Sequence, residues 1–265
     1  MFFHQATGIP FCIFDSAANV IFRDPVIETM ECSRKNLSQY DKMIQMYASS
    51  VPVVITSVVC YFALLPLDNK LNITDSTELA RMEEKISKKK AVELFENGYL
   101  DSYEVGTFQM LFAIHKYLFE EIYDFAGKVR TVNIAKGNFR FAPVMYLQAA
   151  IENVEKMPQS TFDEIVEKYV EMNIAHPFRE GNGRSTRIWL DLILKKELNM
   201  VVDWSVVDKE DYLMAMERSP IKDIEIKYIL KQALTDKIND REVYMKGIDH
   251  SYYYEGYSIY KAEDL

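Results

Sequence analysis

The sequence predicts an all-α fold: a bundle of about eight helices around one central buried helix, with a single β-hairpin. From residue 75 onward, apolar residues recur at i, i+3 and i+4 in successive segments, the spacing of helices with one buried face. The segment 184–198 is apolar on nearly every side, which predicts the central helix. Only residues 129–142 alternate apolar and polar side chains, the two-residue period of strands.

The composition is that of an ordinary globular chain with an excess of acidic residues. Hydrophobic residues make up 49% and charged residues 27% of the 265 residues, and the net charge is −9. Non-specific nucleic-acid binding needs a broad basic face, so we expect no direct nucleic-acid partner. The three cysteines, Cys12, Cys32 and Cys60, give neither a disulfide framework nor a zinc pattern, which favours the reducing cytoplasm.

Residues 1–70 form an N-terminal extension of a different character. No charged residue occurs from Met43 to Leu67. Residues 47–67 are long enough for a membrane segment, although two prolines interrupt the run. A membrane anchor, a buried core segment and a poorly ordered extension outside the functional protein are three open hypotheses, of which we favour the third. A cleavable signal peptide is not expected, because about forty polar-containing residues precede the run.

The core, residues 71–246, begins with helical segments. Asp75 is placed to cap the first helix, and a second, short helix is predicted over residues 91–95. The lysine run 88–90 is interpreted as a solvent-exposed face. His115 lies on the apolar stripe of the next helix, so we interpret it as a hydrogen-bonded core residue rather than a catalyst.

The alternating residues 129–142 predict a β-hairpin with its turn at Lys136-Gly137-Asn138. Two interpretations compete. One is a structural clasp, which a two-stranded hairpin cannot form without packing beneath it. The other is a flap whose free edge pairs with an extended segment of a target protein, and we favour it.

The remaining helices lead to and away from a loop at residue 176. They are predicted over residues 144–156, 160–174, 184–198, about 209–218 and about 221–243. Ser160 and Asp163 have the spacing of a capping box. Gly247 is expected to end the last helix, and Asp249 to cap a new short helix in the C-terminal segment 247–265.

The stretch from His176 to Arg187, HPFREGNGRSTR, places several reactive groups between two helices. Asn182-Gly183 predicts a turn that points backbone N–H groups and a helix N-terminus at one spot, an arrangement that binds phosphate. Arg184 and Arg187, at i and i+3, both reach that spot as bidentate donors. His176 can remove a proton, and Glu180 can hold a divalent cation. A helix–turn–helix with a surface charge cluster accounts for each residue alone but not for their combination, so the stretch predicts a nucleotide-polyphosphate site with a base beside it.

This stretch resembles the signature of the Fic family (filamentation-induced-by-cAMP), HPFx[D/E]GNGRxxR, at every fixed position. The resemblance extends over about residues 75–257. It implies a Fic-type helical bundle that transfers AMP from ATP, with Mg²⁺, to a Ser, Thr or Tyr hydroxyl of a target protein. It implies that His176 is the general base and that Glu180 holds Mg²⁺. The implied nucleotide-binding residues are Phe178, Gly181, Asn182, Gly183, Arg184 and Arg187. The implied target-docking flap comprises Val132, Asn133, Ile134, Ala135, Lys136, Gly137, Asn138 and Phe139.

A second pattern lies in the C-terminal segment. Ser251 and Glu255 are spaced i and i+4, and Gly256 follows as a helix stop. This pattern resembles the Fic inhibitory motif, [S/T]xxxE[G/N], in its C-terminal arrangement. The resemblance implies that Glu255 pairs with Arg187 and so occupies the guanidinium that the γ-phosphate needs. We also consider self-modification of the neighbouring tyrosines, Tyr252, Tyr253, Tyr254 and Tyr257.

Two alternative functions stay open. Doc-type relatives use kinase chemistry and carry lysine at the second glycine of GNGR, so Gly183 favours AMP transfer. The other alternative is a non-catalytic module that binds a nucleotide or a protein, although such a module needs neither His176 nor Glu180. A homo-oligomer and, if residues 47–67 span, a membrane tether are also open.

Overall fold

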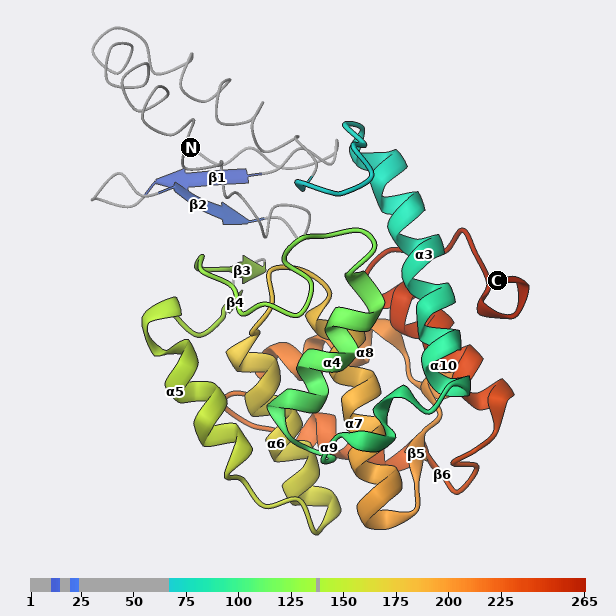
Figure 1. Cartoon of the computed structure of the whole chain (residues 1–265). Coiled ribbons are helices and arrows are strands. Elements are labelled where there is room, and N and C mark those ends of the chain that lie inside the picture. The colour runs from blue at the N-terminus through green and yellow to red at the C-terminus, as the bar shows by residue number, and fades with distance from the viewer. Residues whose placement is uncertain (1–10, 15–19, 24–66, 137–138) are drawn as a thin grey trace, which may run out of the picture.

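The computed structural model describes residues 11–14, 20–23, 67–136 and 139–265. These residues contain eight α-helices and three short antiparallel strand pairs, which confirms the predicted helical fold class (Figure 1). The helices are α3 (Ser76–Glu96), α4 (Phe108–Phe119), α5 (Val144–Glu155), α6 (Phe162–Ala175), α7 (Asn182–Leu198), α8 (Lys209–Arg218), α9 (Ile224–Gln232) and α10 (Arg241–Tyr254). The strands are β1 (Phe11–Phe14), β2 (Val20–Arg23), β3 (Ala135–Lys136), β4 (Phe139–Arg140), β5 (Val201–Val202) and β6 (Leu234–Thr235).

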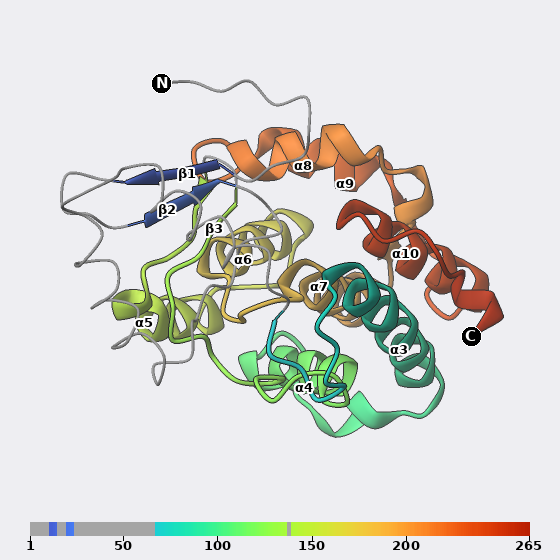
Figure 2. The ribbon, with the colours of Figure 1, turned by 90° about the horizontal axis from the view of Figure 1, so that it is seen from above.

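Helix α7 is the centre of this fold, as predicted. Helices α4, α6 and α10 pack against it, and Figure 2 shows α7 surrounded by them. Trp189, Leu190 and Ile193 are fully buried, and side chains of this size each contribute about 1.5–3 kcal/mol when removed from water. The first two turns of α7 bury polar residues instead, including Arg184 and Arg187. The N-terminal end of α7 is therefore the place where the core carries charge.

Helix α3 differs from its prediction in two ways. Its N-cap is Asp75, as predicted, but one helix of 21 residues replaces the two predicted helices. The interpretation of the lysine run as solvent-exposed is wrong for Lys88, whose side chain is only 1% exposed. Lys88 is covered because the C-terminal segment crosses α3, and its ammonium group pairs with Glu84 and Asp249. A segment distant in sequence thus buries a residue that its local pattern places on the surface.

The end of the chain also departs from the predicted boundaries. Residues 221–243 are not one helix, because β6 and a turn separate α9 from α10. Gly247 does not end a helix but lies inside α10, which begins after its N-cap Asp240. A Cβ atom at Gly247 would lie 3.2 Å from the indole ring of Trp204, so this glycine allows close packing. Gly256, with φ of 93°, follows α10 and ends it as predicted.

The capping box of α6 is one residue later than predicted. Thr161, rather than Ser160, accepts the backbone N–H of Glu164, and the Glu164 carboxylate accepts the backbone N–H of Thr161 in return. Threonine followed by glutamate at N3 satisfies both reciprocal bonds of the motif. Helix α6 therefore starts later than predicted, and His176 is its C-cap residue.

The predicted hairpin is present but short. Strands β3 and β4 pair antiparallel, with Ala135 opposite Arg140 and Lys136 opposite Phe139. The pair β5–β6 was not predicted, because each strand has only two residues and β6 interrupts a helical pattern. The pair β1–β2 lies in the N-terminal extension. Almost all of the possible membrane segment, residues 47–67, lies outside the described residues. Among the described residues, no helix is long and apolar enough to cross a membrane.

Candidate active site

His176 stands at the C-terminal end of α6. It adopts a left-handed conformation, with φ of 48°, that turns the chain out of the helix. Such a conformation costs a residue other than glycine roughly 1–3 kcal/mol, so the surroundings must hold it. The imidazole stacks on Phe141, with ring centroids 3.5 Å apart, and its Nδ1 lies 3.3 Å from the carbonyl oxygen of Asn173. The flap side of the fold therefore fixes the plane of the ring.

Arg130 holds the backbone on both sides of His176. Its Nε donates to the carbonyl of His176 (2.7 Å), and an Nη donates to the carbonyl of Ala175 (3.1 Å). Its own backbone N–H donates to the carbonyl of Pro177 (2.8 Å). No pattern in the sequence indicated this role, because an arginine on the polar face of a hairpin is ordinarily exposed to solvent. Arg130 is instead buried and fixes the position of the predicted base.

The electrostatic surroundings keep His176 neutral. Burial, followed by the positive charge of Lys136, lowers the pKa of His176 to about 3. A neutral imidazole has a nitrogen lone pair available for a proton. His176 is therefore neutral at physiological pH, but a pKa of about 3 makes it a weaker proton acceptor in this closed arrangement than a free imidazole, so its role as the base stays a prediction.

Hydrogen bonds within the loop after His176 hold the shape of that loop. The Asn182 side chain accepts the backbone N–H of Phe178 (2.8 Å) and donates to the carbonyl of the same residue (2.7 Å). Gly181 has φ of 78°, and a Cβ atom there would lie 2.4 Å from the Phe119 ring. Phe178 is fully buried and stacks on His115. In this structure the Asn182 amide and Phe178 shape the loop, and their predicted contacts with nucleotide stay a prediction.

His115 is a core residue, in agreement with its interpretation from the sequence. Its Nδ1 accepts the backbone N–H of Gly127 (2.8 Å), so its Nε2 carries the proton and donates to the carbonyl of Glu180 (2.8 Å). Burial lowers its pKa to about 3, as it does for His176. His115 thus supports the motif loop from below.

The guanidinium of Arg184 lies on the α3 side of the motif loop. One Nη donates to Glu83 of α3 (2.6 Å), and the other donates to Glu180 (2.7 Å). Its side chain is 1% exposed. Glu83 also accepts the hydroxyl groups of Tyr123 and Tyr257. No pattern in the sequence indicated a role for Glu83. Because both Nη groups of Arg184 are bonded to carboxylates, the structure does not support its predicted contact with phosphate.

Arg187 is held by the C-terminal helix. Its Nε donates to the hydroxyl of Ser251 (2.7 Å), and one Nη donates to Glu255 (3.0 Å). The second oxygen of Glu255 accepts from Lys136 of the flap (3.0 Å). A Cβ atom at Gly183 would lie 2.4 Å from the Glu255 carboxylate, so this carboxylate rests directly over the first turn of α7. The structure brings together the predicted motif and the predicted inhibitory pattern.

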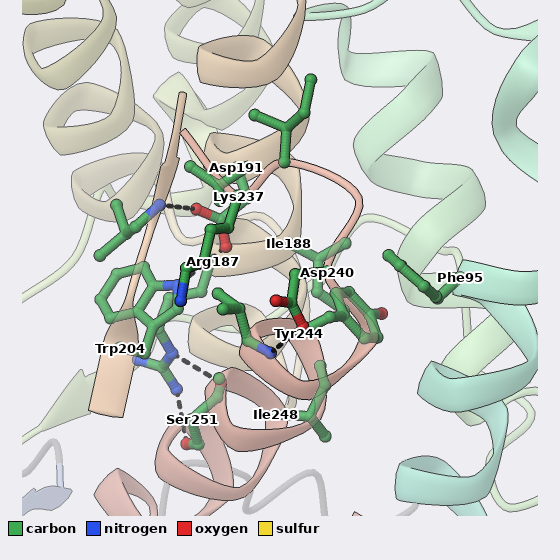
Figure 3. A pocket seen from close by; sticks show the side chains of 15 residues that line it. Phe95, Arg187, Ile188, Asp191, Trp204, Lys237, Asp240, Tyr244, Ile248 and Ser251 are labelled. Carbon is green, nitrogen blue, oxygen red and sulfur yellow. Dashed lines mark hydrogen bonds between the residues drawn. The ribbon is translucent and has the colours of Figure 1, made fainter. Parts of the chain in front are cut away.

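The flap, the motif loop, α8 and Glu255 border a cavity of about 380 Å³, which is within the size range of small-molecule sites. It is lined by Lys136, Phe139, Phe141, Asn173, His176, Glu180, Gly181, Asn182, Gly183, Arg187, Tyr212, Leu213, Met216, Glu217 and Glu255. A second cavity behind Arg187, between α7 and α10, has only about 40 Å³. Figure 3 shows this smaller cavity with Asp191, Trp204 and the bond from Arg187 to Ser251. Its size suits water rather than a nucleotide.

Glu180 is the carboxylate of the motif that lines the larger cavity. Burial raises its pKa, although the charge of Arg184 opposes this effect. No cluster of three or more potential metal ligands exists among the residues that the structure describes. A single carboxylate fits Mg²⁺, which ordinarily takes one or two carboxylates and completes its shell with water and substrate phosphates. Glu180 thus stays the candidate for holding Mg²⁺ beside a nucleotide, with one of its oxygens already bonded to Arg184 and the backbone of Gly181.

Residues 106–194 match the model of the Fic/DOC family, a region that contains the hairpin, His176 and both arginines. A Fic/DOC family domain therefore lies within residues 106–194. The chain is 32% identical over 160 residues to the protein adenylyltransferase VbhT of Bartonella schoenbuchensis, covering 56% of this chain and 32% of VbhT. It is 29% identical over 172 residues to the probable protein adenylyltransferase y4lH of Sinorhizobium fredii, covering 60% of this chain and 86% of y4lH. The chain thus spans about a third of the length of VbhT and most of y4lH.

Solved structures share the fold of the Fic/DOC domain. The BepC protein of Bartonella tribocorum with bound AMPPNP aligns with a TM-score of 0.52 at 18% identity, covering 64% of this chain and 92% of that one. The N-terminal Fic domain of a Bartonella effector protein from strain AR 15-3 aligns with a TM-score of 0.56 at 20% identity, covering 64% and 88%. At these identities the likeness establishes the fold.

The flap of this Fic/DOC domain is partly buried. Ile134 is buried, Val132, Ala135, Lys136 and Phe139 are half-buried, and the exposed Asn133 accepts the backbone N–H of Val144. Gly137 and Asn138 lie outside the described residues.

The four candidate tyrosines are in different surroundings. Tyr252 and Tyr254 are buried, and the Tyr257 hydroxyl donates to Glu83. Tyr253 is 50% exposed. Of the four, Tyr253 is the one whose side chain is largely accessible to solvent.

Proposed function

We propose that this chain is a protein adenylyltransferase that moves AMP from ATP to a Ser, Thr or Tyr hydroxyl of a target protein, and that its own C-terminal helix holds the activity low. Relatives that carry the name protein adenylyltransferase support the reaction class. One observation carries the proposal for the site. The Glu255 carboxylate lies over the N-terminus of α7, bound to Arg187 and Lys136, where an anion is favoured.

The proposed reaction uses His176 as the base. Its neutral imidazole takes the proton of the target hydroxyl as that oxygen forms a bond to the α-phosphorus of ATP. The bond from the α-phosphorus to the bridging oxygen breaks, and pyrophosphate leaves. Gly181 and Gly183 present the start of α7 to the phosphates. Mg²⁺, when bound at Glu180, neutralises phosphate charge.

The proposed inhibition follows from where Glu255 sits. While Glu255 holds Arg187, this guanidinium is not available to the γ-phosphate, and the triphosphate cannot take its productive position. A displacement of about 1 Å in such a reaction can cost about 10²-fold in rate. Ser251 adds a hydroxyl bond and a carbonyl bond to the same arginine. The C-terminal helix therefore supplies three hydrogen bonds that replace those of a phosphate.

The proposed target docks on the flap. An extended segment of the target would pair with the two-residue strand β3, beside the cavity that Lys136 and Phe139 line. Strand β2 of the N-terminal extension contacts β3 in this structure, so it would have to give way to the target. Self-modification is proposed for Tyr253, because its side chain is the accessible one among the four candidates.

The test compares the parent chain, Glu255→Gly, and Glu255→Gly combined with His176→Ala. Each is incubated with Mg²⁺ and ATP labelled at the α-phosphate or at the γ-phosphate, with and without a cell lysate as a source of targets. We expect α-label on protein, about 10²-fold stronger in Glu255→Gly than in the parent and absent in the double variant. Label from the γ-phosphate would establish a kinase instead. Equal labelling of the parent and Glu255→Gly would contradict autoinhibition.

A further inference from the structure

Lys136 is the second cation that touches the inhibitory carboxylate. Its Nζ lies 3.0 Å from one oxygen of Glu255, and an Nη of Arg187 lies 3.0 Å from the other. The two cations come from elements distant in sequence, the flap and α7. All three side chains line the cavity of about 380 Å³. The carboxylate therefore marks an anion position that is bounded by two positive charges.

The charge of Lys136 acts on this position strongly. Burial raises the pKa of Glu255, but the positive charges of Lys136 and then Arg187 outweigh it and hold the pKa well below its usual range. When Glu255 leaves, Lys136 and Arg187 still border the position that its carboxylate occupied. Like charges in a cavity repel each other unless an anion compensates them. A polyphosphate has oxygens that can divide between two cations as the carboxylate oxygens do.

We propose that Lys136 is a phosphate-binding residue of this site: it holds Glu255 while the C-terminal helix is in place and holds the β- or γ-phosphate of the nucleotide when Glu255 leaves. This inference rests on the proposed function and adds a residue from the flap to the phosphate site. The flap thereby has a role in nucleotide binding as well as in target docking.

The proposal predicts effects of opposite sign in two backgrounds. Lys136→Met keeps much of the side-chain stem and removes the charge. In Glu255→Gly, where Lys136 is proposed to hold phosphate, we expect Lys136→Met to raise the Kd of ATP about tenfold, because a charged hydrogen bond is lost. In the parent, the same change removes one partner of Glu255, so AMP transfer rises severalfold. A merely structural role of Lys136 would instead weaken ATP binding in Glu255→Gly and lower AMP transfer in the parent.

The binding experiment is isothermal titration calorimetry of the full chain with Mg²⁺ and ATP, and separately with AMP. We expect Lys136→Met to change the Kd of AMP less than about twofold, because AMP lacks the β- and γ-phosphates. Arg140→Met is the matched control, since Arg140 is an exposed cation on the paired strand β4 and does not line the cavity. We expect it to leave both Kd values unchanged. Lys136→Arg should restore most of the ATP affinity.

Three results would overturn the proposal. An unchanged ATP affinity in Glu255→Gly/Lys136→Met, while Glu255→Gly still transfers AMP, removes Lys136 from the phosphate site and leaves the adenylyltransferase standing. Equal losses of AMP and ATP affinity with a lower Tm indicate that Lys136 only supports the flap. Failure of Glu255→Gly itself to bind ATP or to transfer AMP contradicts both the proposed function and this inference.

Discussion

Arg184 and Arg187 lie one helical turn apart, and their surroundings differ in one decisive way. Both are buried, and each donates to a carboxylate within 3.0 Å. The partners of Arg184 are Glu83 of α3 and Glu180 of the motif loop. The partners of Arg187, Ser251 and Glu255, both belong to the C-terminal segment. The hydrogen bonds of Arg184 thus go to α3 and the motif loop, and those of Arg187 go to the C-terminal segment that lies over the cavity.

Arg184 thus joins parts of the core, whereas Arg187 is the arginine that we propose is exchanged between Glu255 and the nucleotide. Removal of Arg184 leaves two carboxylates behind, and Glu83 is itself buried. An uncompensated buried charge is more costly than the intact pair is favourable. Removal of Arg187 leaves Glu255 with Lys136. Stability should therefore depend on Arg184, and regulation on Arg187.

The largest effect that tests this comparison is on stability. Arg184→Met should lower the free energy of unfolding by about 3–5 kcal/mol, because it leaves Glu83 and Glu180 without their common partner. Arg187→Met should lower it by about 1.5–3 kcal/mol, since Glu255 keeps Lys136. Urea unfolding followed by circular dichroism measures both. Equal losses of unfolding free energy in the two variants would contradict the distinction. Recovery of that free energy when Glu83→Gln is added to Arg184→Met would support it.

An intermediate effect should come from the attachment of the C-terminal segment to α3. Glu84 accepts the backbone N–H groups of Ile259 and Tyr260, and Lys88 donates to the carbonyl of Tyr260. Lys88→Met should loosen this segment and raise AMP transfer severalfold, less than Glu255→Gly does, because the Arg187 contacts remain. Lys89→Met, which changes an exposed lysine on the same helix, is the control. A lower Tm without a gain in AMP transfer would show that the segment stabilises the fold but does not hold the inhibitory helix.

The smallest effect concerns pH. The pKa of Glu255 is held well below its usual range, because Lys136 and Arg187 outweigh the effect of burial. A carboxylate with a lowered folded pKa contributes stability above its unfolded pKa, and that contribution is lost only as the pH falls through the folded value. The ratio of AMP transfer by Glu255→Gly to that by the parent should therefore stay within about twofold between pH 8 and 5. A ratio that falls toward one near pH 5 would mean that Glu255 titrates there and that its pairing is weak.

The sequence alone determined the parts of this protein that depend on neighbours along the chain. The helical period located α4, α6, α7 and α8, and alternation located the hairpin. The motif from His176 to Arg187 predicted a turn between two helices, because a glycine-containing turn and a helix start are local properties. The position of the turn was wrong: Gly181 has the positive φ, and Asn182 and Gly183 already lie in the first turn of α7. The spacing of Ser251 and Glu255 predicted their common face for the same reason, even though the helix that carries them starts at Arg241 rather than after Gly247.

Only the tertiary structure decided which charged groups meet. Glu83, Lys88 and Arg130 occur in patterns that are ordinarily exposed, and each is buried because a segment distant in sequence lies across it. Pairing over such separations depends on how helices pack, and no local period records it. The same reason explains the two arginines. Their spacing along α7 makes them equivalent, whereas α3 on one side and the C-terminal segment on the other give them different partners.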